Sequence, residues 1–154
     1  MKSKLLLILF ILSFYGVTTN AQITFEKMYG GGGPEEGSSV RQTFDGGYIL
    51  CGSSSLNGND AIAMKLDSTG IIEWVKTYSG PSIEGANRIE QLPDSSYIMD
   101  GAYDNGAPPQ YHRHWLLHLD VNGDTLSTGN FTPGVGGAEA SGMIVSSNGN
   151  YGLT

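Results

Sequence analysis

A repeat of about 50 residues most constrains what this chain can fold into. Residues 43–52 return as residues 92–101, and the same pattern begins a third time at residues 147–154. Each copy couples a turn of Asp, Asn, Gly or Ser to a stretch that opens on Tyr, and in the first two copies that stretch ends on Gly. Residues 25–52 align without a gap on residues 74–101 at a constant offset of 49, so the repeat extends well beyond the motif.

Four short stretches with β character fill the second copy, at residues 74–78, 88–92, 97–101 and 114–120, and turn residues separate them. In the last stretch Trp115, Leu117 and Leu119 alternate with His114, Leu116 and His118, so the two sets are expected on opposite faces of a strand. Four strands in a unit of this length predict the blade of a β-propeller, whose sheets pack face to face and are apolar on both sides.

The predicted fold class is therefore all-β, with propeller blades of four antiparallel strands. We expect a first blade repeat over residues 22–73, a second over residues 74–125 and a truncated third over residues 126–154. These are fewer than three blades, whereas closed propellers typically have four to eight. We expect the chain to be a fragment of a larger propeller, or a truncated reading frame with no stable product.

The first 21 residues predict a Sec-type signal peptide. Lys2 and Lys4 precede an apolar run over residues 5–14, and small residues follow at positions 19–21. The run is about ten residues long, whereas crossing a bilayer takes roughly 20. The expected location is secreted or at the cell surface, with no membrane span left after cleavage.

Charge and cysteine content exclude two further classes. The net charge of −7 becomes −9 when Lys2 and Lys4 are cleaved off, and the six remaining Lys and Arg residues are scattered singly. Nucleic acid is not expected as a partner, because an acidic surface repels phosphate. Cys51 is the only cysteine, so no internal disulfide is possible, and we expect it to be a small buried residue.

The repeat also resembles a known family. The motifs Trp-Val-Lys-Thr-Tyr, Glu-Gly-Ala, Asp-Gly-Gly-Tyr-Ile-Leu-x-Gly and Lys-Leu-Asp-x-x-Gly are similar to those of secreted bacterial β-propeller repeat proteins, such as Kelch-like and related blade repeats. Many such proteins carry a C-terminal sorting domain for type IX secretion. The resemblance implies the propeller fold but not a function, since propellers include both binding proteins and enzymes. Asp100 departs from the pattern, because the family has a small apolar residue there, as at Cys51.

Three histidines suggest a weak metal-site hypothesis. His112, His114 and His118 share one face of an extended chain, but His118 lies about 13 Å from His114, so only His112 and His114 are able to share an ion. The alternative is ordinary solvated strand polarity, because His118 aligns with Lys65, which we expect to be exposed. Asp120 begins a sequence like half a calcium loop, but its counterpart Asp67 predicts a plain hairpin turn.

The segment 104–113 carries a four-residue insertion and is the one part that breaks the repeat, so it is the candidate ligand loop. Its side chains for contacting a carbohydrate or a protein are Asp104, Tyr111, His112 and Arg113, with neutral loop drift as the alternative. Glu35 recurs as Glu84, with Glu139 near the third position. Recurrence in every unit favours a structural hydrogen bond to a loop over catalysis.

No motif in the sequence specifies a reaction or a cofactor. The expected function is that of a non-enzymatic secreted or cell-surface scaffold with an adhesion-type binding role. The alternative is the N-terminal part of an exported propeller hydrolase or lyase whose catalytic residues lie beyond Thr154.

Overall fold

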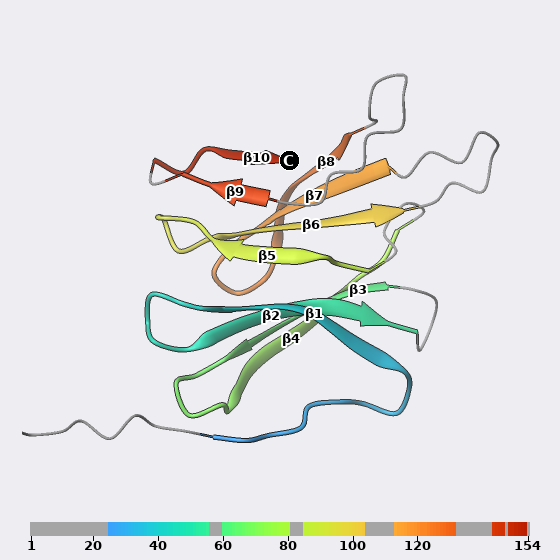
Figure 1. Ribbon diagram of the computed structural model, residues 1–154, viewed down its shortest axis with the longest axis vertical. Helices are drawn as coiled ribbons and strands as arrows, with labels where there is room; N and C mark the ends of the chain where they lie inside the picture. Colours follow the sequence, from blue (N-terminus) through green and yellow to red (C-terminus); the bar gives the residue numbers. More distant parts are fainter. Residues whose placement is uncertain are drawn as a thin grey trace, which may run out of the picture.

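The computed structural model describes residues 25–55, 60–80, 85–103, 113–131, 143–146 and 148–153, and these form an all-β structure. Two four-stranded sheets and a C-terminal hairpin are stacked along the long axis (Figure 1). Among the described residues there is no helix with the length and apolar character needed to cross a membrane. The all-β, four-stranded antiparallel arrangement agrees with the prediction from the repeat.

Both sheets are antiparallel meanders in which each strand pairs with the next along the chain. The first sheet contains β1 (Glu35–Gln42), β2 (Tyr48–Ser54), β3 (Asp60–Leu66) and β4 (Ile72–Tyr78). The second sheet contains β5 (Arg88–Gln91), β6 (Tyr97–Tyr103), β7 (Arg113–Leu119) and β8 (Thr125–Phe131). The hairpin consists of β9 (Met143–Val145) and β10 (Tyr151–Leu153).

The sheets are offset from the predicted repeat units. The unit boundaries expected after residues 73 and 125 fall inside β4 and at the start of β8. The strand that opens each sequence repeat therefore closes the preceding sheet. The reason is local, since a tight turn at residues 67–70 joins β4 to β3 and adjacent strands joined in this way pair with each other.

The turn of the opening motif has the same geometry in all three copies. Asp45, Asp94 and Asn148 each accept a hydrogen bond from the backbone amide two residues further on. The residue directly after the turn Asp has a positive φ, which is 82° at Gly46 and 71° at Ser95. Ser95 carries some backbone strain, because only Gly adopts this region without steric cost. The motif is a hairpin turn.

A close backbone approach explains the Gly that recurs in the Tyr-led strand, although β2 and β6 each continue two residues beyond it. A Cβ atom on Gly52 would lie 1.8 Å from the carbonyl oxygen of Glu36, where β1 crosses it beside a register shift. A Cβ on Gly101 would likewise lie 2.3 Å from the carbonyl oxygen of Gly85. Only a residue without a side chain fits at these two positions.

The core lies in two layers between the stacked elements. The larger cluster joins the two sheets and contains Ile49, Cys51, Ala61, Ala63, Tyr78, Ala86, Ile89, Tyr97, Met99, Trp115, Leu117 and Leu119. The smaller cluster lies between the second sheet and the hairpin and contains Leu92, Ile98, Leu116 and Met143. The alternation predicted for β7 is confirmed, because Trp115, Leu117 and Leu119 enter the first cluster whereas Leu116 enters the second.

Cys51 is buried, as expected from the sequence. It is 2% exposed and lies in the cluster between the sheets. Burial raises the pKa of its thiol to about 12. Because the thiolate is the reactive form, this cysteine is a packing residue in the folded chain.

Candidate functional site

The predicted ligand loop falls mostly outside the described residues. Asp104, Tyr111 and His112 lie there. Arg113 is the first residue of β7, but the structure describes only its backbone. The ligand-loop hypothesis therefore stays a prediction.

The histidines do not form the solvated row that was expected. His114 is 4% exposed, and so lies inside the stack. His118 is partly buried, and its Nε2 atom lies 2.9 Å from the Ser96 hydroxyl. In the described part of the chain no group of three His, Cys, Asp or Glu side chains is placed to hold a metal ion. His112 lies outside it, so the pairing of His112 with His114 is not tested.

Lys65 is also not an exposed residue, because its side chain is only 3% exposed. Its Nζ atom donates to Asp45 at 2.9 Å, to Glu73 at 2.9 Å and to the Leu66 carbonyl at 3.0 Å. Burial lowers the pKa of Lys65, but the bonds to the two carboxylates outweigh it and the net direction is upward. The pKa of Asp45 falls to about 2, because it accepts hydrogen bonds from the Thr43 hydroxyl and from Lys65. The three side chains form one ion cluster.

The second sheet replaces this cluster with a smaller one. Ser96 takes the place of Gly47, and His118 takes the place of Lys65. The Ser96 hydroxyl donates to Asp94 at 2.5 Å, so its oxygen is left to accept from His118 Nε2. A nucleophilic serine would instead give its proton to the histidine. The pair therefore supports the turn and does not form a catalytic dyad.

Aromatic side chains link consecutive units in a repeated way. Trp74 packs edge to face on Tyr97 with 6.1 Å between ring centroids, and Phe25 packs on Tyr48 in the same manner at 5.5 Å. The indole of Trp74 also covers the Gly123 turn. Trp74 therefore packs between neighbouring sheets.

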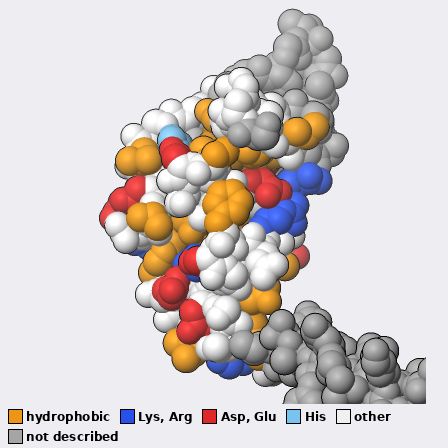
Figure 2. Space-filling view, turned by 90° about the vertical axis from the view of Figure 1, so that its left-hand side faces the viewer, with side chains coloured by type: hydrophobic (Ala, Val, Ile, Leu, Met, Phe, Trp, Pro, Cys, Tyr) orange, Lys and Arg blue, Asp and Glu red, His pale blue; other side chains and the backbone are white. Residues whose placement is uncertain are grey.

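The carboxylates of the two other Asp-led turns accept hydrogen bonds from the backbone amides of their own turn. Asp120 accepts hydrogen bonds from the amides of Asn122 and Asp124, both at 2.8 Å. Asp67 makes the equivalent contacts, so the hairpin interpretation of both sequences is confirmed. Figure 2 shows the side of the stack that carries hairpin turns, with acidic side chains interspersed among separate apolar ones.

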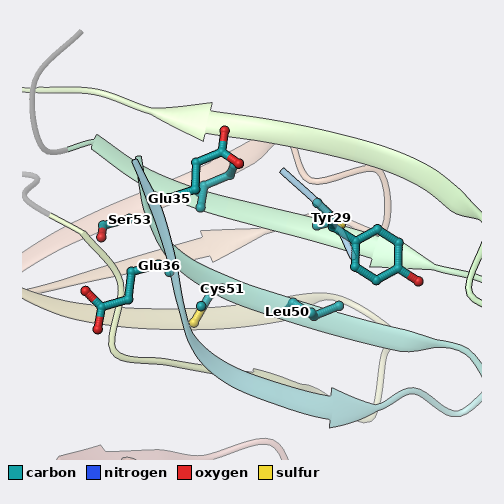
Figure 3. Close-up of a pocket in the computed structure, with 10 residues that line it drawn as sticks. Tyr29, Glu35, Glu36, Leu50, Cys51 and Ser53 are labelled. Atoms are coloured by element: carbon teal, nitrogen blue, oxygen red, sulfur yellow. The ribbon is translucent and has the colours of Figure 1, made fainter. Parts of the chain in front are cut away.

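A pocket of about 160 Å³ lies on the outer face of the first sheet. Leu50, Ile62 and Met64 give it an apolar wall. In Figure 3, Tyr29 and Leu50 lie toward one end of the pocket, whereas Glu35, Glu36 and Ser53 lie toward the other. Its lining combines apolar side chains with two glutamate residues.

The Glu35 carboxylate accepts a 2.7 Å hydrogen bond from the Gly31 amide. This confirms the structural hydrogen bond to a loop that its recurrence predicted. Glu84 and Glu139 lie outside the described residues, so the equivalent bonds are not tested.

Of the pocket residues, Glu35 was singled out in the sequence by its recurrence, but the pocket was not predicted. The available signal was the offset of 53 that aligns Met64 with Leu117, because the same offset places Ile62 opposite Trp115. A large side chain in one copy and a smaller one in the other indicates unequal filling of equivalent space.

Comparison of the chain with protein-family models gives no match, and comparison with curated proteins gives none either.

Proposed function

We propose that this chain is part of a propeller-type stack of blades, of the Kelch-like secreted kind, and that it serves as a non-enzymatic binding module outside the cell. The observation that carries the proposal is the repetition of contacts between units. Phe25 packs on Tyr48 as Trp74 packs on Tyr97, with similar centroid distances of 5.5 and 6.1 Å and ring angles of 76° and 68°. A chain that repeats both its sheets and the contacts between them builds a rigid stack.

A rigid stack of this kind supports binding through the loops that join its strands. The segment from Asp104 to Arg113 connects β6 and β7 and carries the insertion that the first sheet lacks. Its Tyr, His and Arg side chains have the chemistry to stack on sugar rings or to bond a peptide. The proposed ligand class is an extracellular carbohydrate or protein.

Binding of the chain to glycan arrays and to extracellular matrix proteins tests this role. A variant with Tyr111→Ala, His112→Ala and Arg113→Ala should lose at least tenfold in affinity for whatever the chain binds. The matched control replaces Asn57 and Asn59 with Ala in the corresponding loop of the first sheet, and it should bind normally. Equal binding by both variants would refute the loop as the ligand site.

Export is part of the proposal and has its own test. The chain expressed in a bacterial host with a Sec pathway should appear outside the cytoplasm, with a mass that corresponds to cleavage after Ala21. Interrupting the apolar run with Ile8→Arg and Leu12→Arg should hold the uncleaved chain inside the cell. An uncleaved chain in the medium would contradict the signal-peptide prediction.

A further inference from the structure

The second sheet places a carboxyl group on the face that it turns toward the C-terminal hairpin. Asp100 is paired directly with Leu116 across the β6–β7 ladder and lies two residues from Ile98, and both of these belong to the smaller core cluster. Asp100 therefore points toward the hairpin, which lies over the second sheet (Figure 1). The equivalent residue of the first sheet is Cys51, which packs against the second sheet.

Asp100 is buried with one carboxyl oxygen unbonded. It is 2% exposed, and within the described part of the chain its Oδ1 atom accepts no hydrogen bond. An ionised carboxylate in this place loses its hydration, and this loss raises the pKa of Asp100 from 3.8 to about 6. Arg88 faces Asp100 across the β5–β6 ladder and opposes the effect without cancelling it.

The other ionisable groups around Asp100 do not produce the same pH dependence. His114 and His118 share its face of the second sheet, and Glu90 on β5 forms an ion pair with the first sheet. Cys51 lies on the other side, and burial raises the pKa of its thiol to about 12. In the described part of the hairpin Tyr151 is the only ionisable side chain. A buried histidine favours docking as the pH rises, whereas a buried carboxyl disfavours it, so the direction of the effect identifies the group.

The hairpin is held to the stack by the smaller of the two cores. Four buried residues form the cluster beneath it, whereas twelve form the cluster between the sheets. One of the four is Met143, which takes the position of Ile89 in the third copy of the repeat. Ile89 packs in the same cluster as Cys51, so Met143 is the side chain that covers the position of Asp100. Separation of the hairpin from the second sheet is therefore the smallest opening that lets water reach Asp100.

We propose that the docking of the C-terminal hairpin is a pH-sensitive switch, in which the hairpin is held on the second sheet while Asp100 is protonated and opens more readily once Asp100 ionises. In the docked state Asp100 stays neutral up to about pH 6, whereas a hydrated Asp100 in the open state ionises near pH 3.8. The docked state thus binds the proton more tightly. Docking is strongest below pH 3.8 and weakens as the pH rises through about 6.

Amide hydrogen exchange of the chain at intervals from pH 4 to pH 7 measures this opening. After correction for the intrinsic exchange rate, the protection of the amides in β9 and β10 should fall by about 50-fold across this range. Repeating the measurement in about 1 M urea separates local opening from global unfolding, because a local opening exposes little surface and responds weakly to denaturant. The protection of the hairpin amides should therefore change little with urea.

Two variants and a control test the role of Asp100. Asp100→Asn keeps the shape of the side chain and removes its charge, so hairpin protection should no longer depend on pH. Asp100→Cys introduces the residue that the first sheet has at this position, and it should give the same result. Asp60→Asn removes a partly buried carboxyl group of the first sheet and should keep the full pH dependence.

Four results would overturn the proposal. Hairpin protection that does not change with pH would exclude the switch, and protection that increases with pH would assign the titration to a histidine. The same pH dependence in Asp100→Asn and Asp100→Cys as in the unmodified chain would exclude Asp100. Hairpin amides that exchange only through global unfolding would exclude a local opening. None of these results depends on a ligand, so failure here is distinct from failure of the ligand-loop test.

Discussion

The Tyr78 hydroxyl donates a 2.8 Å hydrogen bond to the carbonyl oxygen of Gly123 and so connects β4 of the first sheet to the β7–β8 turn of the second. The same bond, also 2.8 Å long, connects Tyr29 to Gly70 one repeat earlier. A lysine accompanies each tyrosine, since Lys27 donates to the Gly70 carbonyl and Lys76 pairs with Asp124. The aromatic-x-Lys-x-Tyr motif of the sequence is therefore the contact between consecutive units.

Removing this bond should weaken the contact between the sheets. Tyr78 is 8% exposed, so Tyr78→Phe should leave the Gly123 carbonyl without this donor and lower the free energy of unfolding by about 1–2 kcal/mol. Tyr29→Phe should cost less, because Tyr29 is only partly buried and water replaces its hydroxyl. Urea denaturation of both variants measures the difference. A larger loss for Tyr29→Phe would contradict the assignment of Tyr78 as the buried contact.

The close crossing of β1 over Gly52 should make this glycine intolerant of any side chain. Gly52→Ala places a methyl group 1.8 Å from a backbone oxygen, and we expect a loss of at least about 2 kcal/mol in unfolding free energy. Gly37→Ala, in the strand that crosses it, meets no atom within 4 Å and is the matched control. Thermal unfolding by circular dichroism compares them. Equal melting temperatures would show that the crossing does not persist in solution.

The replacement of the Lys65 cluster by a serine and histidine pair predicts coupling between two positions. A Cβ on Gly47 would lie 2.7 Å from Lys65 Nζ and 2.3 Å from the Leu66 carbonyl oxygen, so Gly47→Ser alone should be destabilising. Adding Lys65→His removes the first clash and supplies the partner that Ser96 has in the second sheet. The double variant should be more stable than the sum of the single effects by about 0.5–3 kcal/mol. Strict additivity in a double-mutant cycle would contradict the equivalence of the two clusters.

Asp100 should make stability fall as the pH rises. It is 2% exposed, and burial raises its pKa from 3.8 to about 6, against an opposing effect of Arg88. The folded state thus binds the proton more tightly than the unfolded state. The stabilising contribution is fully present below pH 3.8 and is lost as the pH rises through about 6, a change of about 3 kcal/mol.

Chemical denaturation of the chain and of Asp100→Asn, at intervals from pH 4 to pH 7, measures this contribution. As the pH rises, the unfolding free energy of the unmodified chain should fall by about 3 kcal/mol relative to that of Asp100→Asn. Asp45→Asn is a useful comparison, because the pKa of Asp45 is lowered to about 2 and its contribution is lost only in acid. Parallel pH profiles for the chain and Asp100→Asn would refute a raised pKa at Asp100.

Much of the fold was predictable because it depends on short-range patterns. The hairpin turns at Asp45 and Asp94 follow from residues that bond their own backbone, and the two faces of β7 follow from the alternation around Trp115. The sheet limits were less predictable. A repeat has the same period wherever counting starts, so only the pairing of β4 with β3 shows which strands share a sheet.

The polar sites were predicted less well, because exposure depends on neighbours that a local pattern does not contain. Lys65 and His114 look like surface residues in the sequence, yet they are 3% and 4% exposed. Lys65 is buried with two carboxylates from separate parts of the chain, Asp45 and Glu73, that neutralise its charge. Local spacing carries no information about such a contact.

The sequence by itself determined that this chain forms repeated four-stranded antiparallel units with tight Asp-led turns and an aromatic contact from each unit to the next. The period, the turn residues and the alternation of apolar side chains encode these features locally. Only the tertiary structure decided which equivalent positions are filled. Trp115 lies buried beneath the first sheet, whereas Ile62 leaves a pocket over Gly52, because the stacking of one sheet on another determines where space remains.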